Sequence, residues 1–206
     1  MSGYNGINKA TRKLILSIKM DSDEKKAIIG FQNGDPDAFA ALYDAYVGKI
    51  YSFIYFKTHH RETAEDLTSK TFMKALDGME SFDARKGSFS NWLYSIARNN
   101  VIDFYRIRKS ESDINDIWDL SSSDDVERDI EARQKLEKIE KYIRKLKSEH
   151  REIIILRVWN EMSYKEISEI VGKSEASCKM MFSRSLKELK KEMPLPLLLY
   201  LILLRL

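Results

Sequence analysis

The feature that most constrains this fold is the spacing of apolar residues in one stretch, FDARKGSFSNWLYSIARNNVIDFYRIRK, residues 82–109. From Ser88 on, an apolar stripe repeats at helical spacing, which predicts a helix with one buried face. The residues of this stripe are Phe89, Leu93, Ile96, Ala97, Val101 and Phe104. A second, mostly polar stripe is expected to face solvent: Asn91, Ser95, Arg98, Ile102, Arg106 and Lys109, with Asn99 beside it.

Aromatic and basic residues surround this predicted helix. Phe82, Trp92, Tyr94 and Tyr105 supply flat rings, and a basic turn of residues 84–87 leads into the helix. Cations, amide donors and aromatic rings together suit the backbone and unstacked bases of opened nucleic acid. An amphipathic helix with a solvated basic face has the same pattern, so this stretch alone leaves both interpretations open.

Composition favours an all-α protein of the cytoplasm. Only 8 glycines and 3 prolines occur in 206 residues, which argues against a turn-rich β fold. The single cysteine, Cys178, excludes an internal disulfide and fits a reducing compartment. Residues 1–20 do not resemble a signal peptide, and the apolar run 195–206 is shorter than the roughly 20 residues that span a bilayer.

Charge is informative in its distribution rather than in its sum. The net charge of +3 is the small excess of 35 basic over 32 acidic residues. Residues 111–129 are dominated by Asp, Glu and Ser, which predicts a flexible linker. This acidic segment is either a passive tether or an imitation of nucleic acid inside a basic channel, and the sequence does not separate the two.

The residues before the opening stretch predict three more helices. A short helix over residues 23–33 is followed by a second over residues 36–56, with proline in its first turn. The third is expected to begin at a capping box of Thr63 and Asp66 and to end at Gly78. Its inward residues are predicted to be Ala64, Leu67, Thr71, Phe72 and Leu76. These helices and the one described first form a four-helix unit.

A helix-turn-helix pattern follows the linker. Helical spacing resumes at residue 130, and Ser148 is expected to cap a buried helix over residues 150–160. Ser163 and Glu166 then form a capping box, and a glycine separates this helix from the next. The last helix, capped by Ser174, is predicted to bury Cys178, Phe182, Ser185 and Leu189. A helical hairpin that packs on another element would have a similar pattern.

The sequence contains no set of residues that predicts catalysis, a metal or a cofactor. His59, His60 and His150 have no cysteine or carboxylate companions at the spacing of metal ligands. Glycine-rich phosphate loops and nucleophile motifs do not occur either. The chain is therefore not expected to be an enzyme or to bind a small-molecule substrate.

Taken together, four segments are similar to the sigma factors of bacterial RNA polymerase, in their extracytoplasmic-function (ECF) group. The segments are GDPDAFAALYDAY, DLTSKTFMKAL, FSNWLYSIARNNVIDFYR and MSYKEISEIVGKSEASCKMMFSRSLKEL. The resemblance covers roughly residues 22–192 and implies a four-helix region 2 unit, the acidic linker and a region 4 helix-turn-helix unit. The residues on either side are expected to form an N-terminal appendage and an apolar tail. In chain order, the expected boundaries are 1–21, 22–110, 111–128, 129–192 and 193–206.

The resemblance implies a protein that binds the RNA polymerase core, directs it to promoter DNA and helps to melt the −10 element. Family members usually have an anti-sigma factor as a partner. The alternative is a helix-turn-helix regulator that binds DNA without the polymerase core. That alternative accounts for residues 163–191 but leaves the four-helix unit without a role.

The resemblance also implies three binding surfaces. The surface for the clamp helices of the largest core subunit matches Glu65, Asp66, Ser69 and Lys70. The −10 surface matches Arg85, Lys86, Ser88, Trp92, Arg98, Asn99 and Arg106. The −35 surface matches Ser174, Glu175, Ser177, Lys179, Met180, Arg184 and Lys187. The family commonly has basic residues where this chain has Met181 and Leu186, which predicts a weaker phosphate grip.

The apolar tail allows three arrangements: packing on the second unit, docking on a partner protein, or contact with a membrane surface. Pro194 and Pro196 prevent it from simply extending the preceding helix. A helix on a lipid surface normally shows a basic polar face, and the tail contains only Arg205. We therefore expect the tail to pack on the protein, across the apolar flank of residues 136–159.

Overall fold

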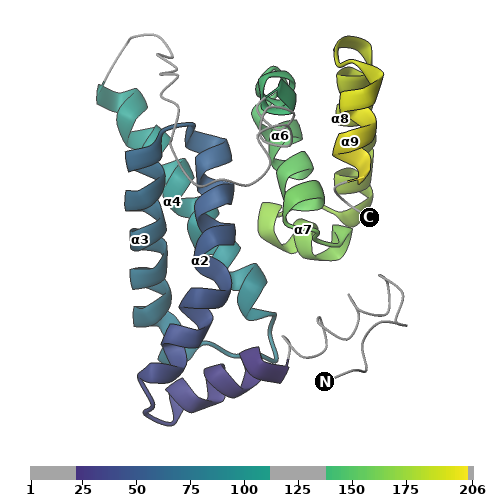
Figure 1. The fold of residues 1–206 in the computed structure, drawn as a ribbon. Helices are drawn as coiled ribbons and strands as arrows, with labels where there is room; N and C mark the ends of the chain where they lie inside the picture. Colours follow the sequence, from purple (N-terminus) through teal and green to yellow (C-terminus); the bar gives the residue numbers. More distant parts are fainter. Residues whose placement is uncertain (1–21, 112–137, 204–206) are drawn as a thin grey trace, which may run out of the picture.

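The protein consists of two groups of helices that lie side by side (Figure 1). The structure, a computed structural model, describes residues 22–111 and 138–203. Within these ranges every regular element is helical and no strand occurs, which confirms the all-α prediction. The predictions for residues 1–21, for the linker from residue 112 and for residues 130–137 lie outside the described residues.

The first unit, residues 22–111, contains the predicted four helices. A helix over residues 22–32 ends at a turn in which Gly34 has a φ of +93°, a conformation that glycine adopts without strain. It is followed by α2 (Asp37–Thr58), α3 (Arg61–Gly78), the short 3-10 helix η1 (Met79–Ser81) and α4 (Phe89–Glu111). The shared core consists of fully or almost fully buried side chains, including Leu42, Ile50, Phe53, Ile54, Ala75, Phe89, Leu93 and Ala97.

Two predictions about α3 are wrong. The cap is His60 rather than Thr63, because the Nδ1 atom of His60 accepts a hydrogen bond from the backbone N–H of Thr63 at 3.2 Å. Leu76 is 42% exposed, because Ala75 completes the buried stripe of this helix instead. The exposed Leu76 therefore belongs to the outer face of α3.

The second unit, residues 138–203, begins with a helical segment over residues 138–144. It continues with α6 (Ser148–Ile154), the π-helical turn η2 (Ile155–Trp159), α7 (Tyr164–Val171), α8 (Glu175–Glu192) and α9 (Leu195–Leu203). The predicted cap at Ser148 is wrong. Ser148 already lies inside the first turn, and the preceding Lys147 makes no side-chain capping bond.

The helix-turn-helix prediction is confirmed by α7 and α8. The Ser163 hydroxyl accepts from the backbone N–H of Glu166 at 3.2 Å, and the Glu166 carboxylate accepts from the Ser163 N–H at 2.7 Å. Gly172 ends α7 with a φ of +68°. Ser174 then caps α8, and the side chains predicted to be inward are buried: Cys178, Phe182, Ser185 and Leu189.

The two units contact each other along a seam formed by α4 with α7 and by α2 with η2. Phe56 of α2 packs against Trp159 of η2, with 5.0 Å between the ring centroids. Further along the seam, Asn160 Nδ2 donates a hydrogen bond to the hydroxyl of Tyr94 at 2.6 Å. No sequence pattern predicted this contact between the two units.

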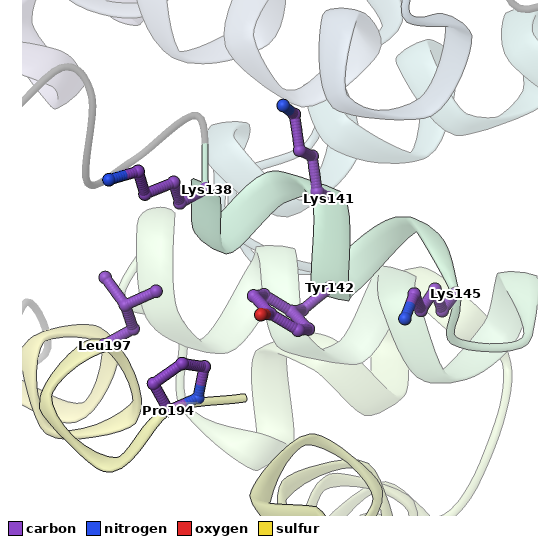
Figure 2. Close-up of a pocket in the computed structure, with 6 residues that line it drawn as sticks. All are labelled: Lys138, Lys141, Tyr142, Lys145, Pro194 and Leu197. Atoms are coloured by element: carbon purple, nitrogen blue, oxygen red, sulfur yellow. The ribbon is translucent and has the colours of Figure 1, made fainter. Parts of the chain in front are cut away.

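The tail forms α9, which packs on the second unit. Leu198 is 5% and Leu201 is 0% exposed, whereas Leu199 on the opposite side of the helix is 50% exposed. Leu197 and Pro194 line a pocket of about 540 Å³ together with Tyr142 and the lysines of residues 138–145 (Figure 2). α9 therefore packs against α8, and its start faces residues 138–145, a part of the expected flank, across this pocket.

Candidate nucleic-acid interface

The buried face of α4 follows the sequence pattern, but its polar face does not. Phe89, Leu93, Ala97 and Val101 are each at most 1% exposed, and the two remaining residues of the apolar stripe are half-buried. On the polar stripe, Asn91 is only 7% exposed because α7 covers it. The expectation that this whole stripe faces solvent is therefore wrong at its N-terminal end.

A pocket of about 350 Å³ lies at the start of α4. The predicted −10 residues Lys86, Ser88 and Trp92 line it, together with Phe82 and Asn91. Ser88 also begins the helix, since its hydroxyl accepts from the backbone N–H of Asn91 at 3.2 Å. A ring, a cation and amide groups around one cavity give it the chemistry to hold a planar polar molecule such as a nucleobase.

Aromatic packing fixes the position of Trp92. Its ring lies 5.0 Å from that of Phe82 and 5.7 Å from that of Phe89, centroid to centroid. A Cβ atom at Gly78 would come within 3.0 Å of the indole, so the end of α3 approaches Trp92 as closely as only glycine allows. Gln32 Nε2 fixes the backbone beside this aromatic group by donating a hydrogen bond to the carbonyl of Phe82 at 2.8 Å.

Arg85 stands apart from this pocket. Its guanidinium donates from Nε and Nη2 to the two carboxylate oxygens of Asp83, at 2.9 and 3.0 Å. The hydrogen bonds from the Arg85 side chain and backbone lower the pKa of Asp83 to about 2. The Arg85 side chain is 90% exposed, so its cation stays at the surface in front of α4.

Arg98 binds a carboxylate of the second unit. Its Nε donates to Oε1 of Glu152 in α6 at 3.1 Å, and Nζ of Lys57 in α2 donates to the same oxygen at 2.7 Å. The side chain of Glu152 is 6% exposed. Burial lowers the pKa of Lys57, and the adjacent Glu152 carboxylate opposes this shift. Further out, Asn99 is exposed, and the exposed Arg106 forms a surface ion pair with Asp103 at 3.2 Å.

The predicted core-binding residues lie together on the exposed face of α3. Glu65, Asp66, Ser69 and Lys70 are all exposed, and Glu65 forms a surface ion pair with Arg61 at 2.9 Å. Met73, at 65% exposure, and Leu76 continue this face by one more turn. Sequence analysis missed this apolar extension, although the spacing of Met73 from residues 66, 69 and 70 is helical.

The predicted −35 residues lie on the outer side of α8. Glu175, Lys179, Met180, Arg184 and Lys187 are exposed, and Ser177 is half-buried. Ser174 is exposed as well. Its hydroxyl caps α8 by accepting a hydrogen bond from the backbone N–H of Ser177 at 3.2 Å. This arrangement gives the second helix of the motif an open basic side, as a helix that enters the major groove requires.

Met181 and Leu186, the two positions that depart from the family pattern, do not lie on this open side. Met181 is 8% exposed and belongs to the core, and Leu186 is half-buried against it. The apolar residues at these positions therefore strengthen packing of α8.

Among the described residues, no group of His, Cys, Asp and Glu side chains could hold a metal ion. In the same ranges, no helix is long and apolar enough to cross a membrane.

A four-helix unit joined to a helix-turn-helix unit defines a class of helical DNA-binding proteins. Family models narrow this class: residues 42–111 match sigma-70 region 2, and residues 136–189 match sigma-70 region 4. The RNA polymerase sigma factor YlaC of Bacillus subtilis is 36% identical over 161 residues, which are 76% of this chain and 92% of that protein. The ECF RNA polymerase sigma factor SigW of the same species is 31% identical, over 82% of this chain and 96% of SigW.

Solved structures agree with this assignment. The sigma factor RpoE in complex with the anti-sigma factor NepR from Bartonella quintana matches with a TM-score of 0.65 and 25% identity, over 74% of this chain and 94% of that one. CnrH in complex with the cytosolic domain of CnrY shares the fold, with a TM-score of 0.62 and 21% identity over 82% and 96% of the two chains.

The chain belongs to the ECF group of RNA polymerase sigma factors. Sigma factors are transcription initiation factors, and this chain acts in promoter-specific initiation of transcription by RNA polymerase. The alternative of a regulator that works without the polymerase core is not favoured, because the matches extend over both units.

Proposed function

We propose that this sigma factor uses three separate surfaces: the outer face of α3 for the polymerase core, the pocket at the start of α4 for the −10 element, and the open side of α8 for the −35 element. The observation that carries the proposal is the pocket, since Lys86, Ser88 and Trp92 converge on one cavity of about 350 Å³. A base that leaves the duplex gains about 1–3 kcal/mol when it stacks on an aromatic side chain.

The other two surfaces are supported by their exposure and charge. Lys179, Arg184 and Lys187 are exposed along α8, where cations contact phosphates while the helix N-terminus reaches base edges. The α3 face combines charged residues with the exposed Met73 and Leu76, a mixture typical of protein interfaces.

The cellular setting follows from the same assignment. RNA polymerase works in the cytoplasm, so we place this chain there. Two structural relatives are solved with anti-sigma factors, NepR and CnrY, and we propose that this chain also has an anti-sigma partner. The protein acts as an initiation factor without catalytic chemistry of its own.

The test compares two lysine variants in reconstituted holoenzyme. Lys86→Ala removes a cation from the pocket, and Lys26→Ala removes an exposed cation from the helix over residues 22–32, far from the pocket in sequence. Transcription from genomic DNA fragments and permanganate reactivity of unpaired thymines report initiation and melting. We expect Lys86→Ala to reduce both and Lys26→Ala to change neither. Equal results for the two variants would remove the −10 assignment of this pocket.

A further inference from the structure

We infer that the groove between residues 138–145 and the start of α9 binds a free long-chain fatty acid. The hydrocarbon chain lies on the apolar floor of the groove, and the carboxylate contacts a lysine at its rim. The residues that line the groove belong to none of the three surfaces proposed above for the core and the promoter. The fatty-acid site is therefore independent of those surfaces.

Two elements far apart in the sequence build the floor of this groove. The helical segment of residues 138–144 contributes the half-buried ring of Tyr142, and the start of the tail contributes Pro194 and Leu197 (Figure 2). The volume of about 540 Å³ lies within the roughly 300–1,000 Å³ typical of small-molecule pockets. A ligand that covers this apolar floor removes hydrocarbon surface from water, which favours binding.

The groove is elongated. Lys138, Tyr142 and Lys145 follow each other at helical spacing on one face of their segment. A rise of 1.5 Å per residue puts the two lysines about 10 Å apart along the helix axis. Figure 2 shows one of these lysines on either side of the Tyr142 ring. A floor of this shape between two cations suits an extended chain better than a compact ring system.

The two ends of the groove differ in how their charge is compensated. At one end, Nζ of Lys145 binds the Glu192 carboxylate at 2.7 Å and lies 5.5 Å from the centroid of the Tyr142 ring. At the other end, the exposed Lys138 makes no ion pair with any residue of the described ranges. Figure 2 places Lys138 on the same side of the groove as Leu197. Its ammonium group is thus the available partner for an anionic head group.

The functional groups of the lining select the class of ligand. Besides the lysine ammonium groups, the described lining residues offer one polar side-chain group, the hydroxyl of Tyr142. Sugars and nucleotides carry many polar groups, and each of these costs free energy when it is covered without a hydrogen-bond partner. A fatty acid has one anionic group and an apolar chain, so each part of it finds its counterpart in the groove.

The source that fits is the free acid in water rather than a lipid in a bilayer. Chains within a bilayer are already removed from water and gain nothing from an apolar floor. A dissolved fatty acid does gain this burial, and each fully buried methylene raises its affinity about fourfold. In an open groove that covers the chain by about half, the expected gain is about twofold per methylene.

Titration calorimetry of the full chain with dodecanoate, below its micelle concentration, tests the site. We expect saturable binding of one molecule per chain. Decanoate is shorter by two methylenes and should bind about fourfold more weakly. Dodecyltrimethylammonium carries a chain of the same length on a cationic head and should not bind. Equal binding of the cation, or binding without saturation, would mean adsorption to apolar surface and would overturn the proposal.

Two pairs of variants locate the site. Lys138→Glu should weaken dodecanoate binding about tenfold, because it replaces an attraction by a repulsion of similar size. Lys165→Glu, an exposed change on α7 with the same effect on net charge, should leave binding unchanged. Leu197→Asp places a carboxylate on the floor and should abolish binding, whereas Leu199→Asp, on the exposed side of α9, should not.

Equal dodecanoate affinities within both pairs would overturn the assignment of this groove. Circular dichroism checks that each variant keeps its helices. If Leu197→Asp loses helix, the lysine pair decides, because both of its positions are exposed in the folded protein.

Sedimentation with phosphatidylglycerol vesicles separates the free acid from a lipid surface. We expect the chain to remain in solution when the vesicles are spun down. Vesicle binding without binding of dissolved dodecanoate would replace the fatty-acid site by a membrane contact. If neither probe binds, the groove is no ligand site and the proposal falls.

Hydrogen exchange measures what the ligand does to the tail. A fatty acid that bridges residues 138–145 and α9 stabilises their contact, so the backbone amides of Leu195–Leu203 should exchange more slowly when dodecanoate is bound. Amides of α2 should exchange at an unchanged rate. Equal slowing in α2 and α9, or no slowing in α9, would contradict binding in this groove.

Discussion

Replacing Leu201 by Ala tests how the tail packs, with Leu199→Ala as its matched partner. Both residues lie on α9 and lose the same atoms, but Leu201 is 0% and Leu199 is 50% exposed. Truncating a buried leucine removes transfer energy and leaves a cavity, for a total of about 2–5 kcal/mol. The half-exposed leucine should lose less than about 1 kcal/mol.

Thermal unfolding measures this difference. In a chain of this size each 1 kcal/mol lowers the melting temperature by roughly 2–4 °C, so Leu201→Ala should melt about 4–20 °C below the wild type. Far-ultraviolet circular dichroism follows the helices directly. Deletion of residues 194–206 should lower stability or solubility in the same direction without abolishing promoter choice.

Identical melting of Leu201→Ala, Leu199→Ala and the wild type would refute the packing of α9 on the second unit. Sedimentation with lipid vesicles then distinguishes the remaining arrangements. If the full chain sediments with vesicles and the truncated chain does not, the tail serves a membrane surface instead.

Three further predictions concern the α3 face, the open side of α8 and the buried His59. Asp66→Arg should weaken co-purification with core polymerase several-fold while Asp44→Arg, an exposed change on α2, should not; equal retention by both would remove the α3 assignment. Lys179→Ala and Arg184→Ala should each flatten the log–log salt dependence of −35 binding by about 0.9 if they contact phosphates, whereas an unchanged slope would mean that α8 docks differently. Burial lowers the pKa of His59, so as the pH falls the unfolded state takes up a proton before the folded state does. The free energy of unfolding should therefore be fully present above about pH 6.5 and should decline below that pH by up to about 1.4 kcal/mol per pH unit. His59→Asn should make the free energy of unfolding less dependent on pH. His60→Asn, which keeps a capping side chain, should leave this pH dependence unchanged. The same pH dependence in both variants would contradict this interpretation.

Local sequence patterns predicted the helices and those of their ends at which a nearby serine or glycine determines the cap. The capping box of Ser163 with Glu166, the left-handed Gly172 and the buried set of α8 all agree with expectation. These features depend on residues within a few positions of each other. The His60 cap escaped notice because histidine is an uncommon cap and Thr63 offered a more usual one.

The seam was not predictable in this way. Glu152 is flanked by isoleucines and an arginine, and nothing near it in the chain indicates a buried ion pair. Its partners Lys57 and Arg98 are 95 and 54 positions away. Periodicity placed Asn91 on a solvent-facing stripe, but α7 of the second unit packs over this end of α4 and leaves Asn91 7% exposed. Burial of a charged or amide side chain by a distant element leaves no local pattern.

The stacking of Trp159 on Phe56 gives the molecule an optical property of its own. An indole that is half-buried against a ring in the seam emits at shorter wavelength than one in water. Separation of the units would hydrate Trp159 and shift its emission to the red, whereas Trp92 lies within the first unit and would keep its packing on Phe82 and Phe89. Replacing Trp92 and Trp118 by Phe would isolate this signal, so that a separation of the units could be followed in the stopped-flow cell.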